Sequence, residues 1–282
     1  MKSPASVLRS IMVISILMMT IEVFAQQQSS TIVYEPQIGQ KGKDVVWVPT
    51  PQELVDKMLE IARVTPADFV IDLGSGDGRT VITAAKLGAR ALGIEFNPEM
   101  VNLSRENAKK EGVAESAQFV EGDLYEADLS NATVITMFLL PEINLKLRPK
   151  LLELKPGTRI VTNTFTMGDW AEDLEVTTEE NWNSWNQAHL WIVPAKVQGR
   201  WKMGKGELNL NQKYQMVEGT YTFAGKSVLL KDAKLRGDII TFAINDHIYT
   251  GQLKGNKISG TTVNTTNNKP GKWSAERSRT DQ

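Results

Sequence analysis

The 282-residue chain contains no cysteine and only two histidines, His189 and His247. The absence of cysteine excludes disulfides, thiolate nucleophiles, a lipoprotein anchor and cysteine-based metal sites. Two imidazoles are too few for a histidine-rich metal centre, and we predict no metal site. An excess of positive charge is also missing, since 32 Lys and Arg stand against 33 Asp and Glu and the formal net charge is -1. We therefore expect no nucleic-acid partner.

An apolar run from Ile11 to Ile21 lies near the amino terminus. Lys2 and Arg9 precede it, and three small or apolar residues ending at Ala25 follow it. This three-part pattern is typical of a secretory signal peptide. The alternative is an uncleaved membrane anchor, but a run of about a dozen residues is shorter than the roughly 20 that span a bilayer. We predict a signal peptide at residues 1–25, cleavage after Ala25, and an exported, periplasmic protein without a stable membrane span.

Composition divides the rest of the chain into three parts. Residues 26–45 are polar and rich in Gln, Ser and Gly, which is typical of a linker. Over residues 46–195 short apolar runs alternate with amphipathic stretches, which predicts a doubly wound, Rossmann-like α/β domain with a parallel sheet. Residues 197–282 carry short alternating segments separated by turn signals. There we expect a small antiparallel β-sandwich or barrel, the alternative being a ragged extension of the first sheet.

The individual elements follow from periodicity and from cap and turn signals. Thr50 and Pro51 are predicted to begin a helix, with the Thr50 hydroxyl as its cap. The expected strands of the first sheet are Phe69–Leu73, Ala91–Glu95, Ala117–Val120, Thr133–Phe138 and Arg159–Phe165. The expected helices between them are Thr80–Leu87, Pro98–Glu111 and Glu142–Leu154. Two further strands, Leu174–Thr178 and His189–Val193, are expected to form an antiparallel pair at the sheet edge. In the β domain we expect strands at Ser227–Leu230, Ile239–Ile244, His247–Leu253 and Lys257–Thr262.

The loop after the first expected strand reads Asp72-Leu73-Gly74-Ser75-Gly76-Asp77-Gly78 and leads straight into a helix. Its glycines allow backbone conformations and a close ligand approach that a Cβ would forbid. The Gly-x-Gly-x-Gly spacing is one residue shorter than that of dinucleotide binders, and Asp72 would repel a pyrophosphate. S-adenosylmethionine carries an ammonium and a sulfonium but no phosphate, so this cofactor fits better than NAD.

Two further carboxylates follow successive strands. Glu95 ends the second expected strand, 21 residues after Gly74, where it can accept hydrogen bonds from both ribose hydroxyls of the cofactor. Asp123 follows the third strand and is placed to accept from the adenine amino group. Because ligands of open α/β sheets bind at the carboxyl ends of the strands, Asp72, Glu95 and Asp123 can serve one site.

These motifs resemble the class I S-adenosylmethionine-dependent methyltransferases. More narrowly, they are similar to the protein-lysine methyltransferases that act on the adenine nucleotide translocator and on the c-type subunit of ATP synthase, and to their bacterial relatives. The resemblance runs from Val48 to Trp170, under half the chain, through the strings Asp72 to Arg79, Glu95-Phe96-Asn97-Pro98, Asp123-Leu124 and Phe138-Leu139-Leu140-Pro141. It implies that Asp72, Gly74, Gly76, Glu95 and Asp123 contact the cofactor and that Phe138 to Pro141 face the methyl acceptor. Ser75, Gly78, Asn97 and Leu124, which lie in the same strings, complete the candidate cofactor-binding set.

Methyl transfer is an in-line displacement at an activated carbon, so alignment of the nucleophile supplies much of the rate. An amine acceptor, such as the protein lysine that the resemblance implies, must be neutral to attack. A desolvating pocket lined by Phe138, Pro141 and Phe165 would lower its pKa. Asn97 and Asn163 are candidate polar residues of this pocket. The fourth strand lacks the Asn/Asp-Pro-Pro-Tyr/Phe string of amino-directed DNA and glutamine methyltransferases, which argues against nucleic-acid amines as acceptors.

We therefore predict an S-adenosylmethionine-dependent methyltransferase with a protein lysine as the candidate acceptor. The alternative is an exported binding protein whose β domain recognises a ligand or an envelope component, and whose first domain has little or no turnover. An NAD-dependent oxidoreductase fits the spacing of the glycine loop less well, and the chain lacks an evident acid for hydride chemistry.

Overall fold

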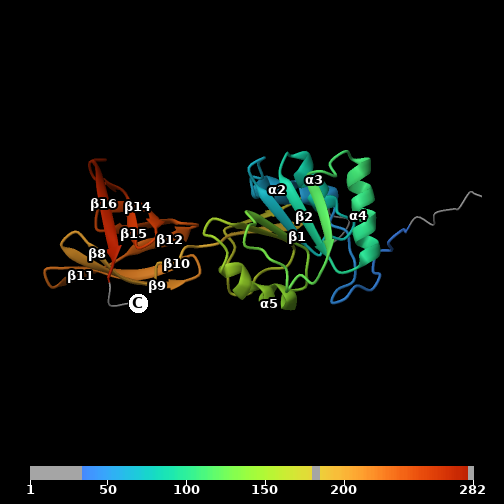
Figure 1. Cartoon of the computed structure of the whole chain (residues 1–282). Coiled ribbons are helices and arrows are strands. Elements are labelled where there is room, and N and C mark those ends of the chain that lie inside the picture. The colour runs from blue at the N-terminus through green and yellow to red at the C-terminus, as the bar shows by residue number, and fades with distance from the viewer. Residues whose placement is uncertain (1–33, 180–184, 279–282) are drawn as a thin grey trace, which may run out of the picture. The chain divides into compact units, whose positions relative to one another are not determined.

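The computed structural model describes residues 34–179 and 185–278, so the predicted signal peptide at residues 1–25 lies outside the described residues. The described residues form a seven-stranded sheet with helices and a nine-stranded sheet (Figure 1). The predicted fold class, a Rossmann-like sheet followed by a small antiparallel β domain, is confirmed. Within the described ranges, no helix is long and apolar enough to span a membrane.

The first sheet has the strand order β3-β2-β1-β4-β5-β7-β6. Its parallel strands are β1 (Phe69–Leu73), β2 (Arg90–Glu95), β3 (Ala117–Glu121), β4 (Val134–Met137) and β5 (Arg159–Asn163). Strand β7 (Gln187–Ile192) runs antiparallel to both β5 and β6 (Leu174–Thr177), as predicted for the edge pair. The strand order reverses between β1 and β4, which creates a ligand crevice at the carboxyl ends of these strands.

Helices cover both faces of this sheet (Figure 1). On one face, α2 (Gln52–Ile61), α3 (Arg79–Lys86) and α4 (Pro98–Lys110) contribute to a single buried cluster. On the other face, α5 (Pro141–Leu152) packs with Trp170 and Trp191. Since successive side chains of a strand point to opposite faces, Val70 joins the first cluster and Ile71 the second. Helices α3, α4 and α5 begin and end within two residues of their predicted positions.

The predicted capping role of Thr50 is wrong. Pro51 occupies the cap position of α2, which among the described residues has no side-chain cap. The Thr50 hydroxyl instead accepts a hydrogen bond from Nδ2 of Asn163 at 3.3 Å, and both residues are buried. The pairing satisfies two buried polar groups and ties the start of α2 to the end of β5.

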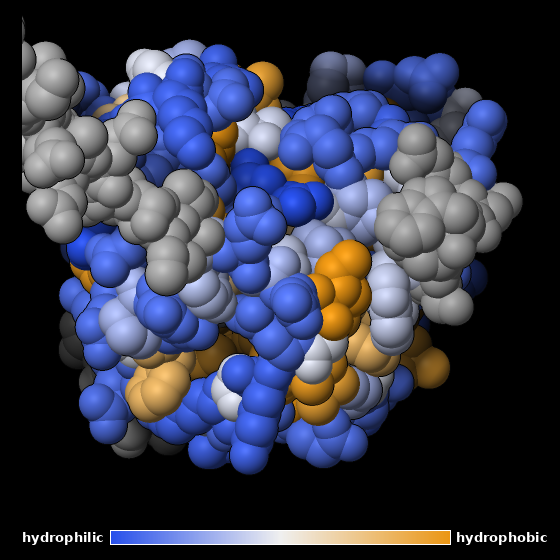
Figure 2. Space-filling view, turned by 90° about the vertical axis from the view of Figure 1, so that its right-hand side faces the viewer, coloured by the Kyte–Doolittle hydropathy of each residue, from blue (hydrophilic) through white to orange (hydrophobic). Residues whose placement is uncertain are grey.

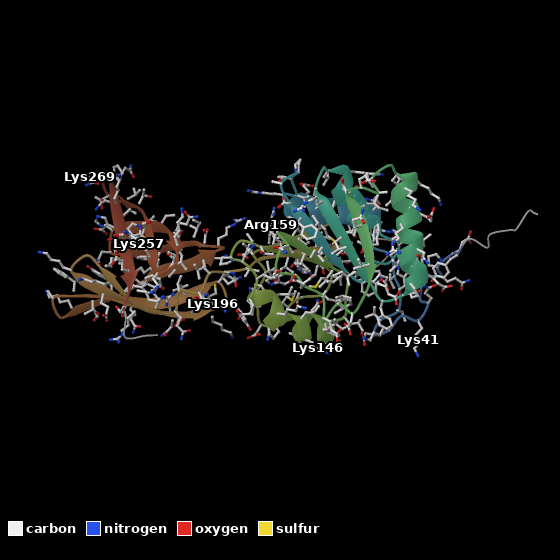
Figure 3. All side chains as sticks on the ribbon, viewed as in Figure 1. Lys41, Lys146, Arg159, Lys196, Lys257 and Lys269 are labelled. Carbon is white, nitrogen blue, oxygen red and sulfur yellow. The ribbon has the colours of Figure 1, made fainter. Side chains whose placement is uncertain are left out.

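Arg159, labelled in Figure 3, lies at the amino end of β5 and links this strand to the segment that follows α2. Its guanidinium pairs with the carboxylate of Asp68 and donates to the carbonyl oxygens of Ala62 and Arg63, which follow α2. These bonds lie at the opposite end of the parallel strands from the ligand crevice, so we assign Arg159 to the scaffold.

The second sheet is an antiparallel meander that closes on itself. Its strands are β8 (Gly199–Met203), β9 (Gly206–Lys213), β10 (Met216–Phe223), β11 (Lys226–Leu229), β12 (Lys231–Arg236), β13 (Ile239–Ile244), β14 (His247–Lys254), β15 (Lys257–Asn264) and β16 (Pro270–Arg277). Strand β16 pairs with β8, and β10 pairs with β9 on one side and with β11 and β12 on the other. Strands β11 and β12 pair with different parts of the same side of β10 and so share one position in the sheet. The nine strands therefore form an eight-stranded barrel, not a sandwich.

Side chains fill the barrel interior. Trp201 and Leu235 are fully buried, and the Phe242 ring stacks on Tyr249 at 5.1 Å between centroids and meets Trp273 edge-on at 5.3 Å. An eight-stranded barrel has an interior of the width that side chains can fill. The second sheet therefore has its own hydrophobic core, and the alternative of a ragged extension of the first sheet is wrong.

Candidate active site

The glycine loop after β1 forms one wall of a cavity. Gly74 and Gly76 adopt φ angles of 76° and 55°, a backbone region that favours glycine. The Gly74 N–H donates to the carbonyl oxygen of Ile94 at 2.9 Å and so ties the loop to the end of β2. A Cβ at Gly76 would lie 2.6 Å from Nε1 of Trp47. Both conformation and space therefore require glycine at position 76.

Asp72, at the carboxyl end of β1, holds a buried carboxyl group. It is 6% exposed and accepts a hydrogen bond from the Thr136 hydroxyl at 2.6 Å. Burial raises the pKa of Asp72 from its ordinary value of 3.8 to about 7; the Thr136 hydrogen bond opposes this rise and the charge of Glu95 adds to it. A cation bound beside Asp72 would favour the ionised carboxylate. This part of the cavity suits a positively charged ligand.

Glu95 joins two loops at the end of β2. Its Oε2 accepts from the N–H of Gly76 at 3.0 Å, and its Oε1 accepts from the N–H of Asn97 at 2.9 Å. Asn97 caps α4, because its Oδ1 accepts from the N–H of Glu99 at 2.9 Å. The two backbone bonds orient the Glu95 carboxylate, whose remaining lone pairs can accept from hydroxyl groups of a ligand.

Asp123 follows β3 and pairs with a lysine from the amino-terminal side of the chain. Nζ of Lys43 lies 2.7 Å from its Oδ2, and the N–H of Tyr125 donates to its Oδ1 at 2.8 Å. The hydrogen bond from Lys43, with that from Tyr125, lowers the pKa of Asp123. Lys43 also lies 4.7 Å from the centroid of the Phe96 ring. Asp123 thus lines the cavity as an ionised hydrogen-bond acceptor. In this structure its carboxylate forms an ion pair with Lys43.

Residues 39–47 form a short hairpin beside the glycine loop. The N–H of Gly39 donates to the carbonyl oxygen of Trp47, and the N–H of Trp47 donates to that of Gln40, each at 2.9 Å. The hairpin and the residues after it, from Gln40 to Thr50, line the cavity. The polar composition of residues 26–45 predicted a linker, so this wall of the cavity was not predicted. Trp47 beside a polar stretch was the signal that could have found it.

The cavity has a volume of about 510 Å³, within the roughly 300–1,000 Å³ of small-molecule sites. It is lined by the predicted residues Asp72, Gly74, Ser75, Gly76, Glu95, Asn97, Asp123, Leu124 and Phe138, and also by Phe165. Figure 2 shows the side of the first sheet's domain on which α4 lies in Figure 1: the visible face is mostly hydrophilic, with hydrophobic residues gathered near its middle. The structure therefore brings together most of the predicted site at one place.

Three candidates lie outside the cavity lining. Gly78, with φ of 84°, precedes α3, and a Cβ there would lie 2.7 Å from the Phe119 ring, so packing accounts for this glycine. Pro141 is the exposed first residue of α5. The side-chain amide of Asn163 bonds to Thr50, as described above.

Three aromatic rings meet in the cavity wall. Phe138 follows β4, Phe165 follows β5 and Trp185 precedes β7. The ring centroids are 6.1 Å apart for Phe138 and Phe165, 5.5 Å for Phe138 and Trp185, and 5.6 Å for Phe165 and Trp185. Trp185 is not among the residues predicted for the site. A tryptophan just ahead of an antiparallel strand was the signal, because such a strand starts at the edge where the parallel strands end.

Comparisons with known proteins match this geometry. A family model described as the ANTKMT methyltransferase domain matches residues 72–174. A protein-lysine N-methyltransferase of Saccharolobus islandicus is 45% identical over 152 residues, which are 53% of this chain and 94% of that protein. A Homo sapiens lysine N-methyltransferase named for the c-type subunit of ATP synthase is 37% identical over 45% of this chain and 54% of its own length. A crystal structure of an RNA methyltransferase from Salinibacter ruber in complex with S-adenosyl-L-homocysteine has 50% identity and a TM-score of 0.50, over 53% of this chain and 96% of that one.

The chain belongs to the ANTKMT family of S-adenosylmethionine-dependent methyltransferases. The predicted family, enzyme class and cofactor are confirmed, and the alternative of a binding protein with little turnover is not favoured. The chain spans about half the length of the human relative.

The residues of this methyltransferase fit the cofactor. The ammonium and sulfonium of S-adenosylmethionine suit the buried carboxyl group of Asp72. Its ribose hydroxyls suit the oriented carboxylate of Glu95. Gly74 and Gly76 have no side chains, so the cofactor can come close to the backbone of the loop at these positions.

Proposed function

We propose that this methyltransferase modifies the ε-amino group of a lysine in a protein. The relatives in Saccharolobus islandicus and Homo sapiens are named for lysine N-methylation, and these names support the proposal. The observation that carries it is the aromatic cluster of Phe138, Phe165 and Trp185 in the cavity wall.

Methyl transfer to an amine moves a positive charge. When bound, S-adenosylmethionine supplies a methyl group on a cationic sulfur, an electrophile that needs no further activation. The lysine gives its proton to solvent and attacks the methyl carbon as a neutral amine. As the nitrogen–carbon bond forms, the carbon–sulfur bond would break and the sulfur would leave as a neutral thioether, so the positive charge passes to the lysine nitrogen. An aromatic face within about 6 Å of a cation stabilises it by about 0.5–2 kcal/mol.

The aromatic cluster can act at two stages of this reaction. Its apolar surface strips water from the entering lysine, which favours the neutral amine before attack. Its ring faces then stabilise the charge that develops on the nitrogen in the transition state. The rings also offer apolar walls to the four methylene groups of the lysine stem. Positioning and charge stabilisation together require no further acid or base on the protein.

RNA is the second candidate acceptor. The Salinibacter ruber structure is that of an RNA methyltransferase, and nucleobases stack on aromatic rings as in many RNA-binding sites. RNA binding, however, depends strongly on contacts between phosphates and basic residues. The formal net charge of -1 supplies no overall excess of such residues, which favours a protein acceptor.

The test uses the purified chain, S-adenosylmethionine with a tritiated methyl group, and an extract of source cells in which the gene has been deleted. We expect the label to be lost on protease digestion and recovered as N-methyl-lysine after acid hydrolysis. Label that is sensitive to ribonuclease and resistant to protease would refute the lysine proposal and support RNA.

Variants of the aromatic cluster sharpen the test. Trp185→Ala should lower kcat/KM for the protein acceptor about tenfold, because a desolvated cation–π contact contributes on the order of 1–2 kcal/mol. Its affinity for S-adenosylmethionine should not change, and Trp185→Phe should recover part of the activity. Phe223→Ala, which removes an exposed aromatic ring from β10, is the matched control and should behave like the parent.

We further propose that the chain is exported to the periplasm and cleaved after Ala25. The support is the order of Lys2, Arg9 and the apolar run before Ala25. Cell fractionation with amino-terminal sequencing should find a mature protein that begins at Gln26. A cytosolic protein that retains Met1 would contradict this proposal.

A further inference from the structure

Outside the cavity, three side chains that can bind a metal ion converge at the edge of the first sheet. Glu175 lies on β6, His189 lies on β7 and Glu172 just precedes β6. One ligand atom from each lies within 4.8 Å of the other two. Glu175 and His189 are register partners in the β6–β7 pair, so the backbone ladder sets their side chains opposite each other.

The buried imidazole of His189, unpaired among the described residues, indicates that this cluster binds a ligand. It is 3% exposed, and within residues 34–179 and 185–278 neither of its ring nitrogens has a hydrogen-bond partner. Its Nδ1 lies 3.9 Å from Oε2 of Glu175, beyond hydrogen-bond distance. Buried polar atoms in folded proteins are nearly always hydrogen bonded or bound to an ion. An imidazole that lacks such a bond and faces two carboxylates is therefore suited to a cation.

We propose that Glu172, Glu175 and His189 bind a divalent transition-metal ion, with zinc as the preferred ion. The proposal is independent of the methyl acceptor. It departs from the expectation of no metal site, because that expectation considered cysteine and histidine-rich sites and not one imidazole with two carboxylates. Three protein ligands of this type leave a fourth position for water, a common arrangement around zinc.

The three ligand atoms, which lie within 4.8 Å of one another, must move closer together to bind the ion. Metal–ligand bonds of roughly 2.0–2.2 Å in a tetrahedral site place ligand atoms about 3.4 Å apart. The 3.9 Å between His189 and Glu175 must therefore shorten by about 0.5 Å. Glu175 is exposed on an edge strand and can rotate to do so. Magnesium and calcium prefer all-oxygen sites, so they should bind more weakly than zinc.

A bound ion would join the last two strands of the sheet. Strand β6 has four residues and occupies the sheet edge, where it pairs with β7. Beyond the strands, the N–H of Thr178 donates to the carbonyl oxygen of Asn186 at 2.9 Å. Asn186 adjoins Trp185 of the aromatic cluster, so the ion would stabilise the edge that leads to this ring.

The test titrates the full chain, produced without a polyhistidine tag and treated with a chelator, with zinc chloride by calorimetry. We expect one zinc ion per chain, weaker binding of manganese, and the weakest binding of magnesium. His189→Asn should abolish zinc binding. Glu175→Gln should weaken it at least about tenfold, since even residues that only support metal ligands contribute about 10–100-fold. His247→Asn removes the other imidazole of the chain and is the matched control, with unchanged binding expected.

The exposed position of Glu175 keeps the proposal falsifiable if His189→Asn fails to fold. At the same zinc concentration, zinc should raise the melting temperature of the parent and of His247→Asn more than that of Glu175→Gln. A folded parent that binds no zinc would overturn the proposal. Equal zinc affinity in the parent and Glu175→Gln would do so as well, as would loss of binding in His247→Asn.

Discussion

Asp72→Asn offers the sharpest test of how the cofactor site works. The substitution removes the negative charge but keeps an oxygen that can accept from the Thr136 hydroxyl, which lies 2.6 Å from Asp72. Burial raises the pKa of Asp72 to about 7 in the ligand-free protein. A cationic ligand prefers the ionised carboxylate, so binding of S-adenosylmethionine below pH 7 must first release the proton.

The expected size of the effect follows from this pKa. At pH 8 the carboxyl group is mostly ionised, and at pH 6 only about a tenth of the molecules carry the charge. The affinity for S-adenosylmethionine should therefore fall about tenfold from pH 8 to pH 6 in the parent. Asp72→Asn should bind more weakly at pH 8 and show only the pH dependence of the ligand itself. The difference between the two curves of affinity against pH gives the contribution of the Asp72 charge to cofactor binding.

The folding stability of the ligand-free protein should fall as the pH rises, whereas its affinity for S-adenosylmethionine should increase. Because the folded-state pKa of Asp72 lies above its ordinary value of 3.8, the folded state binds the proton more tightly than the unfolded chain. The Asp72 contribution therefore destabilises the fold as the pH rises from about 4 to about 7, by up to about 4 kcal/mol. Asp72→Asn should remove this loss and be more stable than the parent at pH 8.

Calorimetric titration with S-adenosylmethionine measures the affinity as a function of pH. Urea unfolding of the ligand-free chains at pH 5 and pH 8 measures the folding stability. Titration curves of parent and Asp72→Asn that run parallel in pH would refute the proposed charge pairing. A variant that is less stable than the parent at pH 8 would refute the assignment of a buried, destabilising carboxylate.

Three further substitutions test the scaffold of the site and the barrel. Glu95→Ala should weaken S-adenosylmethionine binding at least about tenfold in calorimetry, because it removes a charged acceptor, and hydrogen bonds to charged groups contribute about 1.5–3 kcal/mol; unchanged affinity would contradict its role. Gly76→Ala should also reduce cofactor binding, since φ is 55° and the new Cβ would meet Trp47; a variant with parent-like affinity would show that the loop tolerates a side chain. Trp201→Ala should destabilise the barrel by about 3–5 kcal/mol in urea unfolding, as expected for a fully buried aromatic residue; a loss below about 1 kcal/mol would contradict its place in the core.

The first sheet and the cofactor side of the site could be predicted because their signals are local. Asp72 and the glycines after it occupy seven consecutive residues, and β1 was predicted with its observed bounds, Phe69–Leu73. Glu95 ends the next strand, so sequence order alone brings it to the same edge of a parallel sheet. Closure of the second sheet depends on the pairing of β16 with β8, and this non-local contact left the choice between barrel and sandwich open.

The remaining features depend on the direction of one strand. Because β7 runs antiparallel to β5, its start lies beside Asn163 at the carboxyl end of β5, and Trp185 is thereby carried into the cavity wall next to Phe165. The same pairing sets His189 opposite Glu175 on β6. A parallel β7 would place Trp185 at the other edge of the sheet, so neither contact follows from spacing along the chain. The sequence predicted this edge pair without a role in the site, whereas in the structure Trp185 just ahead of β7 joins the aromatic cluster and His189 on β7 supplies the imidazole of the proposed metal site.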